Sequence, residues 1–553
     1  MTIPALAHAR PHHLSDAALA GLGAGHPDAA TIAELRRSQL SRHLLLLHEI
    51  AATLRQSPSK QTEHLPQPLA DRTSAAPDEP IAALAAAERE APARVRELLA
   101  DPLFGVWAVS CLKALREGAS PEQAGLTHLA TLATAAHIPH QRNHDDRALT
   151  ATHDGLTISV RLEDRDPLRA HLGLTPAPRL TNEQLRRWRE KFTGAWRLLV
   201  TAVRPDAEVL AAVLTCIVPV EPDPAARGIS ATSADAFGAV AISEPADATA
   251  LAVGLLHEAQ HSILNAVQYL FGLLEAPGLT GYSPWRDDPR PASGILHGAY
   301  AYLTVTRFWR TQRRDRLAQF EFARWRAAVV AAGEGLRELT PAGARFVGAL
   351  LDEVRPWLAE PVEPAVLRLA EGANRDHYLR WRLRNLRIEP DDVAALTQAW
   401  HAGQPPPQVT PRLQPMARRA LEANARLDLT HRFLRGHSLE GLGTDPRPAE
   451  GNGAAPEQQR ENRTAEHELR RQGRAPGQHT SRSGQAAKVG NGEADVAYVL
   501  GERERALRAY RKVGLVGVDW VGLIIAGGFD VAPEVASVLA GVGEPLEIVR
   551  WLS

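Results

Sequence analysis

The strongest constraint on the fold of this chain is an apolar segment that carries two histidines and a glutamate. Residues 255–261 read Leu-Leu-His-Glu-Ala-Gln-His, which is the pattern H-E-x-x-H. Apolar residues recur around this segment with the period of a helix, and its flanks are apolar enough to predict a buried helix. Side chains at positions i and i+4 share one helix face, so His257 and His261 are close enough to bind one metal ion.

A metal site needs at least a third protein ligand. The candidates that follow the motif are Glu275, Asp287, Asp288 and His297. Glu275 lies in or just beyond the same helix, where it points the wrong way or lies too far along. His297 begins a new helical pattern after a loop with enough Pro and Gly to turn the chain back. Gly298 beside it would allow a close approach to the first helix. The predicted ligands are therefore His257, His261 and His297.

The composition limits the kinds of partner and metal site that this chain can have. The 553 residues include 63 basic and 64 acidic side chains, and this balance argues against a general nucleic-acid binder. The two cysteines exclude a disulfide framework and a cysteine-based zinc cluster. Any metal among the 22 histidines must be held by nitrogen and oxygen ligands. No export signal or membrane span is recognisable, so we expect a cytoplasmic protein with no membrane partner.

The chain is expected to be mainly helical with a small antiparallel β-sheet, an α+β fold with the HExxH helix in the core of the catalytic domain. Helical patterns cover 14–54, 82–136 and 295–423, and strand patterns cover 147–152, 156–162, 213–220 and 237–242. Asp154-Gly155 predicts a hairpin turn between the first two strands. Residues 1–442 are predicted to form the catalytic domain, 443–493 a disordered linker, and 494–553 a small helical tail domain.

Two other groups of residues invite a functional reading. His144 and Asp146 form H-x-D, the start of a facial triad for non-haem iron, and His137 and His140 stand nearby. That triad belongs on a barrel of about eight strands, and far fewer are predicted here. The arginines from Arg375 to Arg387 spread around a helix, which indicates a solvated face rather than a nucleic-acid site.

The motifs together resemble a known family. The chain resembles, over roughly residues 10–440, the HExxH-motif proteins of ribosomal peptide natural product pathways, which are 2-oxoglutarate-dependent peptide β-hydroxylases. The similar segments are His13-Leu14-Ser15, Phe237-Gly238, Leu256 to His261, Asp288-Pro289-Arg290-Pro291, Leu296 to Ala301 and Arg380-Trp381-Arg382-Leu383-Arg384. The HExxH and His-Gly-Ala-Tyr-Ala segments are the most specific of these. Residues 443–553 lie outside the resemblance.

The resemblance implies Fe(II) as the metal and 2-oxoglutarate as the cosubstrate. A precursor peptide would then be hydroxylated at a β-carbon, and other peptide-maturation enzymes would be possible partners. The distal carboxylate of 2-oxoglutarate needs a cationic anchor, for which Arg290 is the first candidate and Arg382 the second. Glu258 would then order the surroundings of the metal or a proton path rather than act as a hydrolytic base.

Two alternatives stay open. In a zinc metallopeptidase, His257 and His261 bind zinc and Glu258 acts as the general base for metal-bound water. Against this reading, no helical glutamate is well placed as third ligand, and the longer H-x-x-G-x-x-H extension is absent. The second alternative is a non-catalytic adaptor whose C-terminal helices bind a partner.

Overall fold

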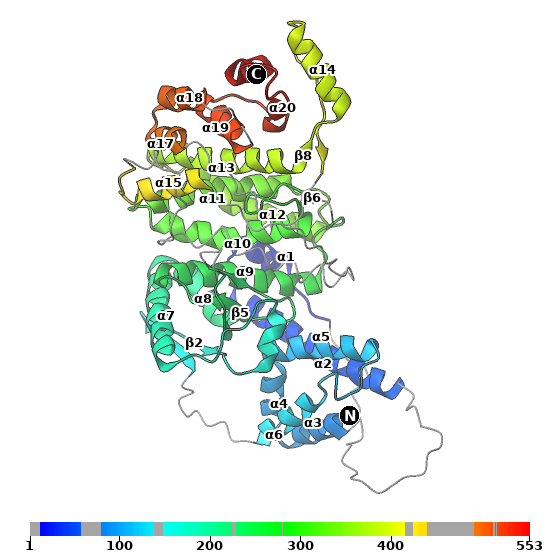
Figure 1. Ribbon diagram of the computed structural model, residues 1–553. Coiled ribbons are helices and arrows are strands. Elements are labelled where there is room, and N and C mark those ends of the chain that lie inside the picture. The colour runs from blue at the N-terminus through cyan, green and yellow to red at the C-terminus, as the bar shows by residue number, and fades with distance from the viewer. Residues whose placement is uncertain are drawn as a thin grey trace. The chain divides into compact units, whose positions relative to one another are not determined.

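The computed structural model describes residues 11–56, 79–137, 147–223, 228–278, 280–414, 424–439, 492–511, 515 and 517–553 (Figure 1). The fold is mainly helical with small sheets, as the sequence predicts. The chain forms two compact units. The first consists of Met1–Leu22, His26–Asp223 and Gly228–Gly272, and Leu273–Ser553 make up most of the second.

Helices make up most of the first unit. They are α1 (Asp16–Gly23), α2 (Ala29–Gln56), α3 (Glu79–Glu90), α4 (Pro92–Leu99), α5 (Pro102–Arg116), α6 (Thr127–His137), η2 (Pro167–Leu172), α7 (Asn182–Ala202), α8 (Arg204–Val213) and α9 (Ala248–Leu270). Apolar side chains of α2 to α6 share one core. The two N-terminal helical regions predicted from the sequence are thereby confirmed.

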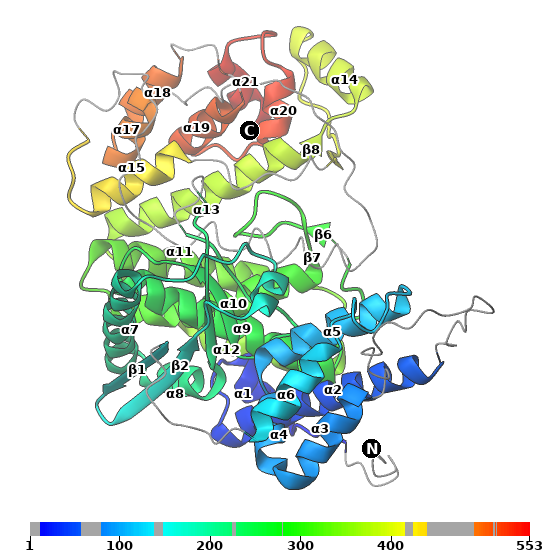
Figure 2. The ribbon, with the colours of Figure 1, turned by 60° about the horizontal axis from the view of Figure 1, so that its bottom comes forward.

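A five-stranded sheet with the order β1-β2-β3-β5-β4 also lies in the first unit. Its strands are β1 (Ala148–His153), β2 (Leu156–Leu162), β3 (Cys216–Val220), β4 (Ser230–Ala231) and β5 (Ala239–Ser243). The predicted hairpin is confirmed: β1 and β2 are joined at Asp154 and Gly155, which both have positive φ angles. Figure 2 shows this hairpin beside α7, which packs against β1.

The sheet is mixed, and the expectation of an antiparallel sheet is wrong for its centre. The outer pairs β1–β2 and β4–β5 are antiparallel, but β2–β3 and β3–β5 are parallel. Helices α7 and α8 stand between β2 and β3 in the sequence, and such a crossover returns the chain in the same direction. Every residue of β3 and β5 is buried, as is typical of parallel strands.

The second unit contains long helices and two short hairpin-like pairs. Its elements are β6 (Thr280–Gly281), β7 (Arg290–Pro291), α10 (Ala292–Thr311), α11 (Arg316–Gly335), α12 (Pro341–Val354), η3 (Arg355–Ala359), α13 (Pro364–Asn385), β8 (Leu386–Arg387), α14 (Pro390–His401), β9 (Arg412–Leu413), α15 (Ala425–Leu434), α17 (Gly492–Leu500), α18 (Arg503–Arg511), α19 (Val518–Gly527), α20 (Pro533–Val538) and α21 (Pro545–Leu552). Helix α11 packs against both α10 and α13, and α13 packs against α19 and α20 (Figure 1).

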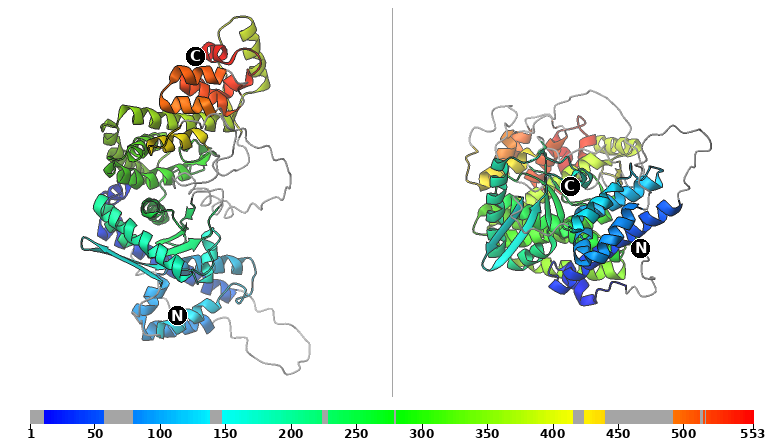
Figure 3. Two further views of the ribbon diagram at one scale, coloured as in Figure 1. Left: turned by 60° about the vertical axis from the view of Figure 1, so that its left-hand side comes forward. Right: turned by 90° about the horizontal axis from the view of Figure 1, so that it is seen from below.

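The C-terminal helices share a core with α13 and α14. Tyr510, Trp520 and Leu523 lie in the same apolar cluster as Leu379 of α13 and Leu396 of α14. The orange-to-red helices accordingly gather beside α13 (Figure 3). The predicted helical character of residues 494–553 is confirmed. The predicted boundaries of the linker stay predictions, because residues 440–491 lie outside the described part of the chain.

No single helix in the described residues is long and apolar enough to cross a membrane. One bent pair, α4 with α5, meets the length and composition criteria when its two helices are taken together, with a bend of 73° between them.

Candidate functional site

Helix α9 carries the HExxH motif and is a buried helix, as its sequence predicts. Asp247 caps its N-terminus by accepting a 2.8 Å hydrogen bond from the backbone N–H of Ala250. From Ala250 to Leu264 every side chain of the helix is buried. The motif therefore lies in the interior of the first unit, packed against α7 and α8 as well as the sheet.

The imidazoles of His257 and His261 face each other. Their Nε2 atoms are 3.0 Å apart and their ring planes are nearly perpendicular, at 84°. Two imidazole nitrogens bound to one metal at about 2.0–2.1 Å lie roughly 3.0–3.4 Å from each other, so this pair fits two ligands of one ion. Burial lowers the pKa of His261 to about 4. At neutral pH this imidazole is uncharged, as a metal ligand must be.

Glu258 is held by hydroxyl groups from β4 and the residue beyond it. Ser230 Oγ donates to Oε1 and Thr232 Oγ1 donates to Oε2, each at 2.6 Å. Thr232 Oγ1 also lies 3.2 Å from the backbone carbonyl of Glu258. Only 1% of this glutamate is exposed. Both carboxylate oxygens are thus engaged by neutral donors, and the acid fastens α9 to the edge of the sheet.

Gly238 allows a close approach between two backbone segments beside α9. It precedes β5 with φ at +84°, and a Cβ there would lie 2.5 Å from the carbonyl oxygen of Val213. Its backbone N–H donates to Ser262 Oγ of α9 at 2.9 Å. The Phe237-Gly238 segment therefore links the sheet to the turn of α9 that follows His261.

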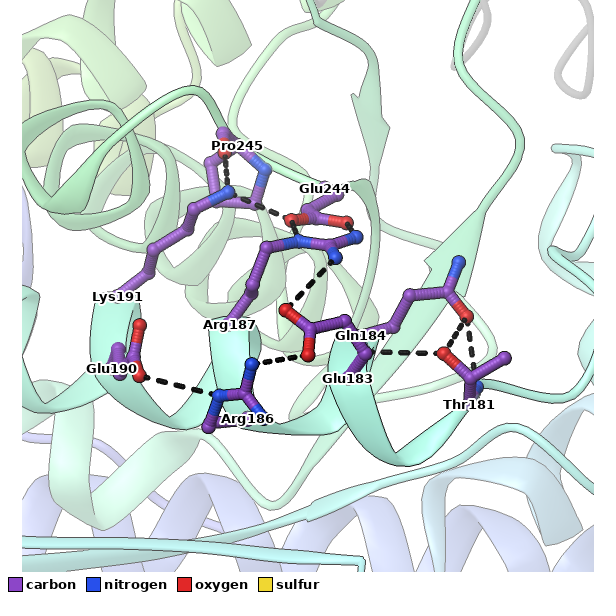
Figure 4. A network of polar contacts seen from close by, with 9 residues as sticks. All are labelled: Thr181, Glu183, Gln184, Arg186, Arg187, Glu190, Lys191, Glu244 and Pro245. Carbon is purple, nitrogen blue, oxygen red and sulfur yellow. Dashed lines mark hydrogen bonds and ion pairs between the residues drawn. The ribbon is translucent and has the colours of Figure 1, made fainter.

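The connection from β5 to α9 is anchored by an ion cluster on α7 (Figure 4). Arg187 makes two hydrogen bonds to the carboxylate of Glu244, at 2.8 and 2.9 Å. Lys191 Nζ binds the same carboxylate at 2.8 Å and the carbonyl oxygen of Pro245 at 2.7 Å. The hydrogen bond from Arg187, supported by Lys191, lowers the pKa of Glu244 to about 2. This cluster fixes the turn that leads into the motif helix.

His297 lies in the second unit, near the start of α10, and is half-buried. The predicted reason for Gly298 beside it needs correction. A Cβ on Gly298 would lie 2.5 Å from the indole of Trp285, so this glycine makes room for a tryptophan of its own unit. Trp285 in turn stacks on Tyr302 with ring centroids 5.0 Å apart. His297 remains the predicted third ligand.

The loop before α10 holds Arg290 and brings a second arginine to it. Arg290 is buried, and its Nη1 lies 3.7 Å from Oδ2 of Asp288. Arg286 Nε donates to Oδ1 of the same carboxylate at 2.9 Å. Burial alone would raise the pKa of Asp288, but the hydrogen bond and charge of Arg286 outweigh it and hold this pKa below its usual range. Sequence reasoning missed Arg286, although its spacing of two from Asp288 and four from Arg290 was a usable signal.

Arg382, the second candidate anchor, already has an internal partner. Its Nε lies 3.0 and 3.2 Å from the two carboxylate oxygens of Glu534 on α20, and its Nη2 also binds that carboxylate. Burial would lower the pKa of Arg382, but the hydrogen bonds that it donates to Glu534 outweigh burial and raise this pKa. Both predicted anchors, Arg290 and Arg382, therefore already contact a carboxylate of their own unit.

The arginines of α13 and of β8, which follows it, do not form the solvated face that the sequence suggested. Arg384 Nη1 lies 3.0 Å from Oδ2 of Asp287, and Arg387 Nη1 donates to the carbonyl oxygens of Leu383 and Leu386. These side chains, like Arg382, bind acceptors of their own unit because the loop before α10 and helix α20 pack onto α13. The C-terminal part of α13 thus joins the loop before α10 and helix α20 within the second unit.

Within the described residues, no group of three or more histidine, cysteine, aspartate or glutamate side chains is placed to hold a metal ion. His257 and His261 supply two nitrogen ligands. The alternative H-x-D residues His144 and Asp146, with His140, lie outside the described part of the chain. His137 is described, and its Nδ1 lies 3.5 Å from Glu90. No protein-family model matches the chain, and no curated protein matches it either.

Proposed function

We propose that the protein is an Fe(II)- and 2-oxoglutarate-dependent oxygenase that hydroxylates a β-carbon in a ribosomally made precursor peptide. The observation that carries the proposal is the buried imidazole pair of His257 and His261, with Nε2 atoms 3.0 Å apart. These two residues would hold the metal in the core helix of the catalytic domain, with His297 as the predicted third ligand. Iron, when bound, supplies the activation of O₂ that C–H hydroxylation needs.

The contacts of Glu258 support an oxygenase over a zinc peptidase. A peptidase with this motif uses the glutamate to take a proton from metal-bound water. In this chain both carboxylate oxygens accept short hydrogen bonds, from Ser230 and Thr232. Each oxygen keeps a second lone pair that could take up a proton. Two short hydrogen bonds to the sheet are nevertheless the contacts of a glutamate that fixes the helix, and this is the role we assign to Glu258.

The first experiment measures metal binding and cosubstrate turnover. The full-length protein, purified without oxygen, is loaded with Fe(II), and bound iron is determined by elemental analysis. On addition of O₂ and 2-oxoglutarate we expect succinate to form, and a precursor peptide to gain one oxygen atom per succinate. His257→Ala and His261→Ala should each lose iron, whereas His171→Ala, an exposed histidine of the same unit, should bind it normally. A zinc-loaded protein that cleaves peptides and forms no succinate contradicts the proposal.

Two further variants sharpen the test. His297→Ala should abolish iron binding as His257→Ala does; if iron occupancy survives, the third ligand is elsewhere. Glu258→Gln separates the two enzyme classes, because a peptidase loses its general base and nearly all activity. An oxygenase whose glutamate is structural should retain measurable succinate formation, at a level set by how well the amide replaces the carboxylate between the two hydroxyl groups.

A further inference from the structure

The sheet of the first unit has two unlike edges. Strand β4, at one edge, consists of two residues, and both are buried. Strand β1 has six residues and forms the opposite edge, beside α7 (Figure 2). No strand among the described residues pairs with its outer side. A strand edge of this length is a template on which another extended chain can pair.

The register of the hairpin determines which backbone groups of β1 face outward. Hydrogen-bonded and non-hydrogen-bonded pairs alternate along an antiparallel ladder. The backbone N–H of Leu162 donates to the carbonyl oxygen of Arg147 at 2.9 Å, so this first pair is hydrogen-bonded. The next residue and every second one after it, Ala148, Thr150 and Thr152, therefore turn their N–H and C=O groups away from β2. None of these groups makes a hydrogen bond to another described residue.

Strand β1 lacks the features that keep a strand edge from pairing. Protected edges carry charged side chains, a proline or a bulge. The sequence of β1, Ala-Leu-Thr-Ala-Thr-His, has no lysine, arginine, acid or proline, and its residues pair with β2 without a bulge. The hydroxyl of exposed Thr150 lies 2.9 Å from that of Ser159. The side chains on this face are thus neutral and paired across the hairpin, and the unmatched groups of the edge belong to the backbone.

Helix α7 adds a positive charge beside this edge. Thr201 Oγ1 lies 3.2 Å from Nε2 of His153, the last residue of β1. Arg197 is one turn earlier on the same face of α7. It is exposed and makes no hydrogen bond or ion pair with another described residue. From Phe192 to Ala202 it is the only charged residue of the helix. A segment that pairs with β1 therefore lies next to unbalanced positive charge, which favours acidic side chains.

We propose that β1 binds an extended, acidic segment of the precursor peptide as a sixth strand of the sheet. Hydrogen bonds between main chains hold the segment, and Arg197 selects its charge. That the segment belongs to a precursor peptide rests on the proposed function, whereas the addition of a strand follows from β1 itself. Neighbouring strands are about 4.8 Å apart, so β1 lies about 14 Å from β5, which leads into α9. The bound segment is therefore a recognition segment, separate from the residue that is hydroxylated.

The experiment selects peptides on the full-length protein and then removes one outward N–H. The probe is a phage-displayed library of random peptides of about ten residues, long enough to pair with all of β1. Enriched peptides are synthesised, and their Kd is measured by fluorescence anisotropy. We expect acidic peptides whose binding weakens as salt is added. Thr150→Pro should weaken them about tenfold or more, because edge strands tolerate a proline whose missing N–H faced outward. Thr150→Val keeps that N–H and should bind them normally.

Further variants separate lost binding from a broken hairpin. Ala151→Pro removes an N–H that bonds to β2, and Thr150→Pro should unfold at a higher temperature than this reference. Arg197→Glu should weaken acidic peptides about tenfold, whereas Arg55→Glu, an exposed arginine on α2, should leave them unchanged. Methylation of the peptide's own backbone nitrogens needs no protein variant. It should abolish binding at alternate positions, where the N–H faces β1, and be tolerated at the positions between them.

The outcomes separate this inference from the proposed function. Peptide binding with these dependences, in a protein that neither binds iron nor forms succinate, supports the docking strand and overturns the oxygenase. Hydroxylation of a precursor peptide with a KM that Thr150→Pro leaves unchanged overturns the inference and leaves the oxygenase intact. The inference is also overturned if no peptide is enriched, or if methylation of the peptide nitrogens shows no alternation. A dimer that Thr150→Pro dissociates in sedimentation would assign β1 to a second copy of the chain instead.

Discussion

Arg426 and Arg286 are both arginines of the interior of the second unit, but they differ in how completely they are bound. Arg426 on α15 donates from Nε to Asp495 at 2.9 Å, from Nη2 to the phenol oxygen of Tyr510 at 3.0 Å, and from Nη1 to Asp376. Arg286 has Asp288 as a partner for Nε, and its Nη1 is buried without one in the described residues. The first cluster is closed by the protein itself, and the second is left open.

The difference lies in how much of each buried charge is balanced by partners within the protein. Burial would lower the pKa of Arg426, but Asp495, Tyr510 and Asp376 outweigh it and raise this pKa well above its usual value. That cluster ties α15 to α13, α17 and α18. The charge of Arg426 is therefore balanced within the protein and stabilises the packing of these helices. In the second cluster, Nη1 of Arg286 is buried and has no hydrogen-bond partner among the described residues.

The largest predicted effect compares these two arginines directly. Arg426→Met leaves Asp376 and Asp495 buried without their counter-charge, and we expect a loss of about 3–5 kcal/mol in the free energy of unfolding. Arg286→Gln removes a guanidinium whose carboxylate keeps Arg290 nearby, so the loss should be about 1 kcal/mol. Denaturant unfolding followed by circular dichroism measures both. Equal losses for the two variants would mean that the open cluster is as structural as the closed one.

Much of the fold was visible in the sequence because it is encoded by local patterns. The strict alternation from Leu156 to Leu162 and the Asp154-Gly155 turn produced the hairpin, and the helical period around His257 produced α9. The parallel centre of the sheet was not visible, since strand direction depends on a crossover through α7 and α8 rather than on the strand residues. The residues around Trp520 likewise give no sign that Leu396 belongs to the same apolar core.

For the candidate site, spacing along one helix was predictive and contacts between distant segments were not. The i, i+4 rule brought His257 and His261 together. The donors to Glu258 come from β4, far away in the sequence and without a recognisable motif. Arg382 looked available as an anion anchor because its partner Glu534 lies 152 positions further along the chain.

A second prediction concerns Glu258, whose carboxylate is bound by neutral hydroxyl donors instead of by a charge as in the Arg426 cluster. Thr232→Val keeps the shape of the side chain but removes the hydroxyl that donates to Oε2 of Glu258. The buried carboxylate then loses this short hydrogen bond, and we expect a loss of about 1–3 kcal/mol in the free energy of unfolding. Thr150→Val, which breaks an exposed hydroxyl pair with Ser159 on the hairpin, is the matched control and should change stability far less. A loss no larger than that of the control would mean that Thr232 does not secure Glu258.

The smallest predicted effect concerns a closed cluster that water reaches. Glu244 is bound by Arg187 and Lys191, chiefly through the hydrogen bond from Arg187, and its pKa falls from 4.5 to about 2. Because the folded pKa lies below the unfolded one, the stabilisation is complete above about pH 4.5 and is lost as the pH falls towards 2. With 28% of the side chain exposed, solvent screening limits its size to about 1 kcal/mol.

Glu244→Gln should therefore lower the free energy of unfolding by about 1 kcal/mol at pH 7, and the difference from the unsubstituted protein should shrink between pH 4.5 and pH 3. Urea unfolding at a series of pH values measures it. The control is Glu190→Gln on α7, whose exposed ion pair with Arg186 lies outside the Glu244 cluster and should contribute less. A difference for Glu244→Gln that stays constant with pH would show that packing, rather than charge, accounts for the anchor of the β5–α9 turn. Glu244 would then stabilise the turn through the packing of its side chain. The buried Arg426 cluster differs, because its contribution to the free energy of unfolding comes from paired charge.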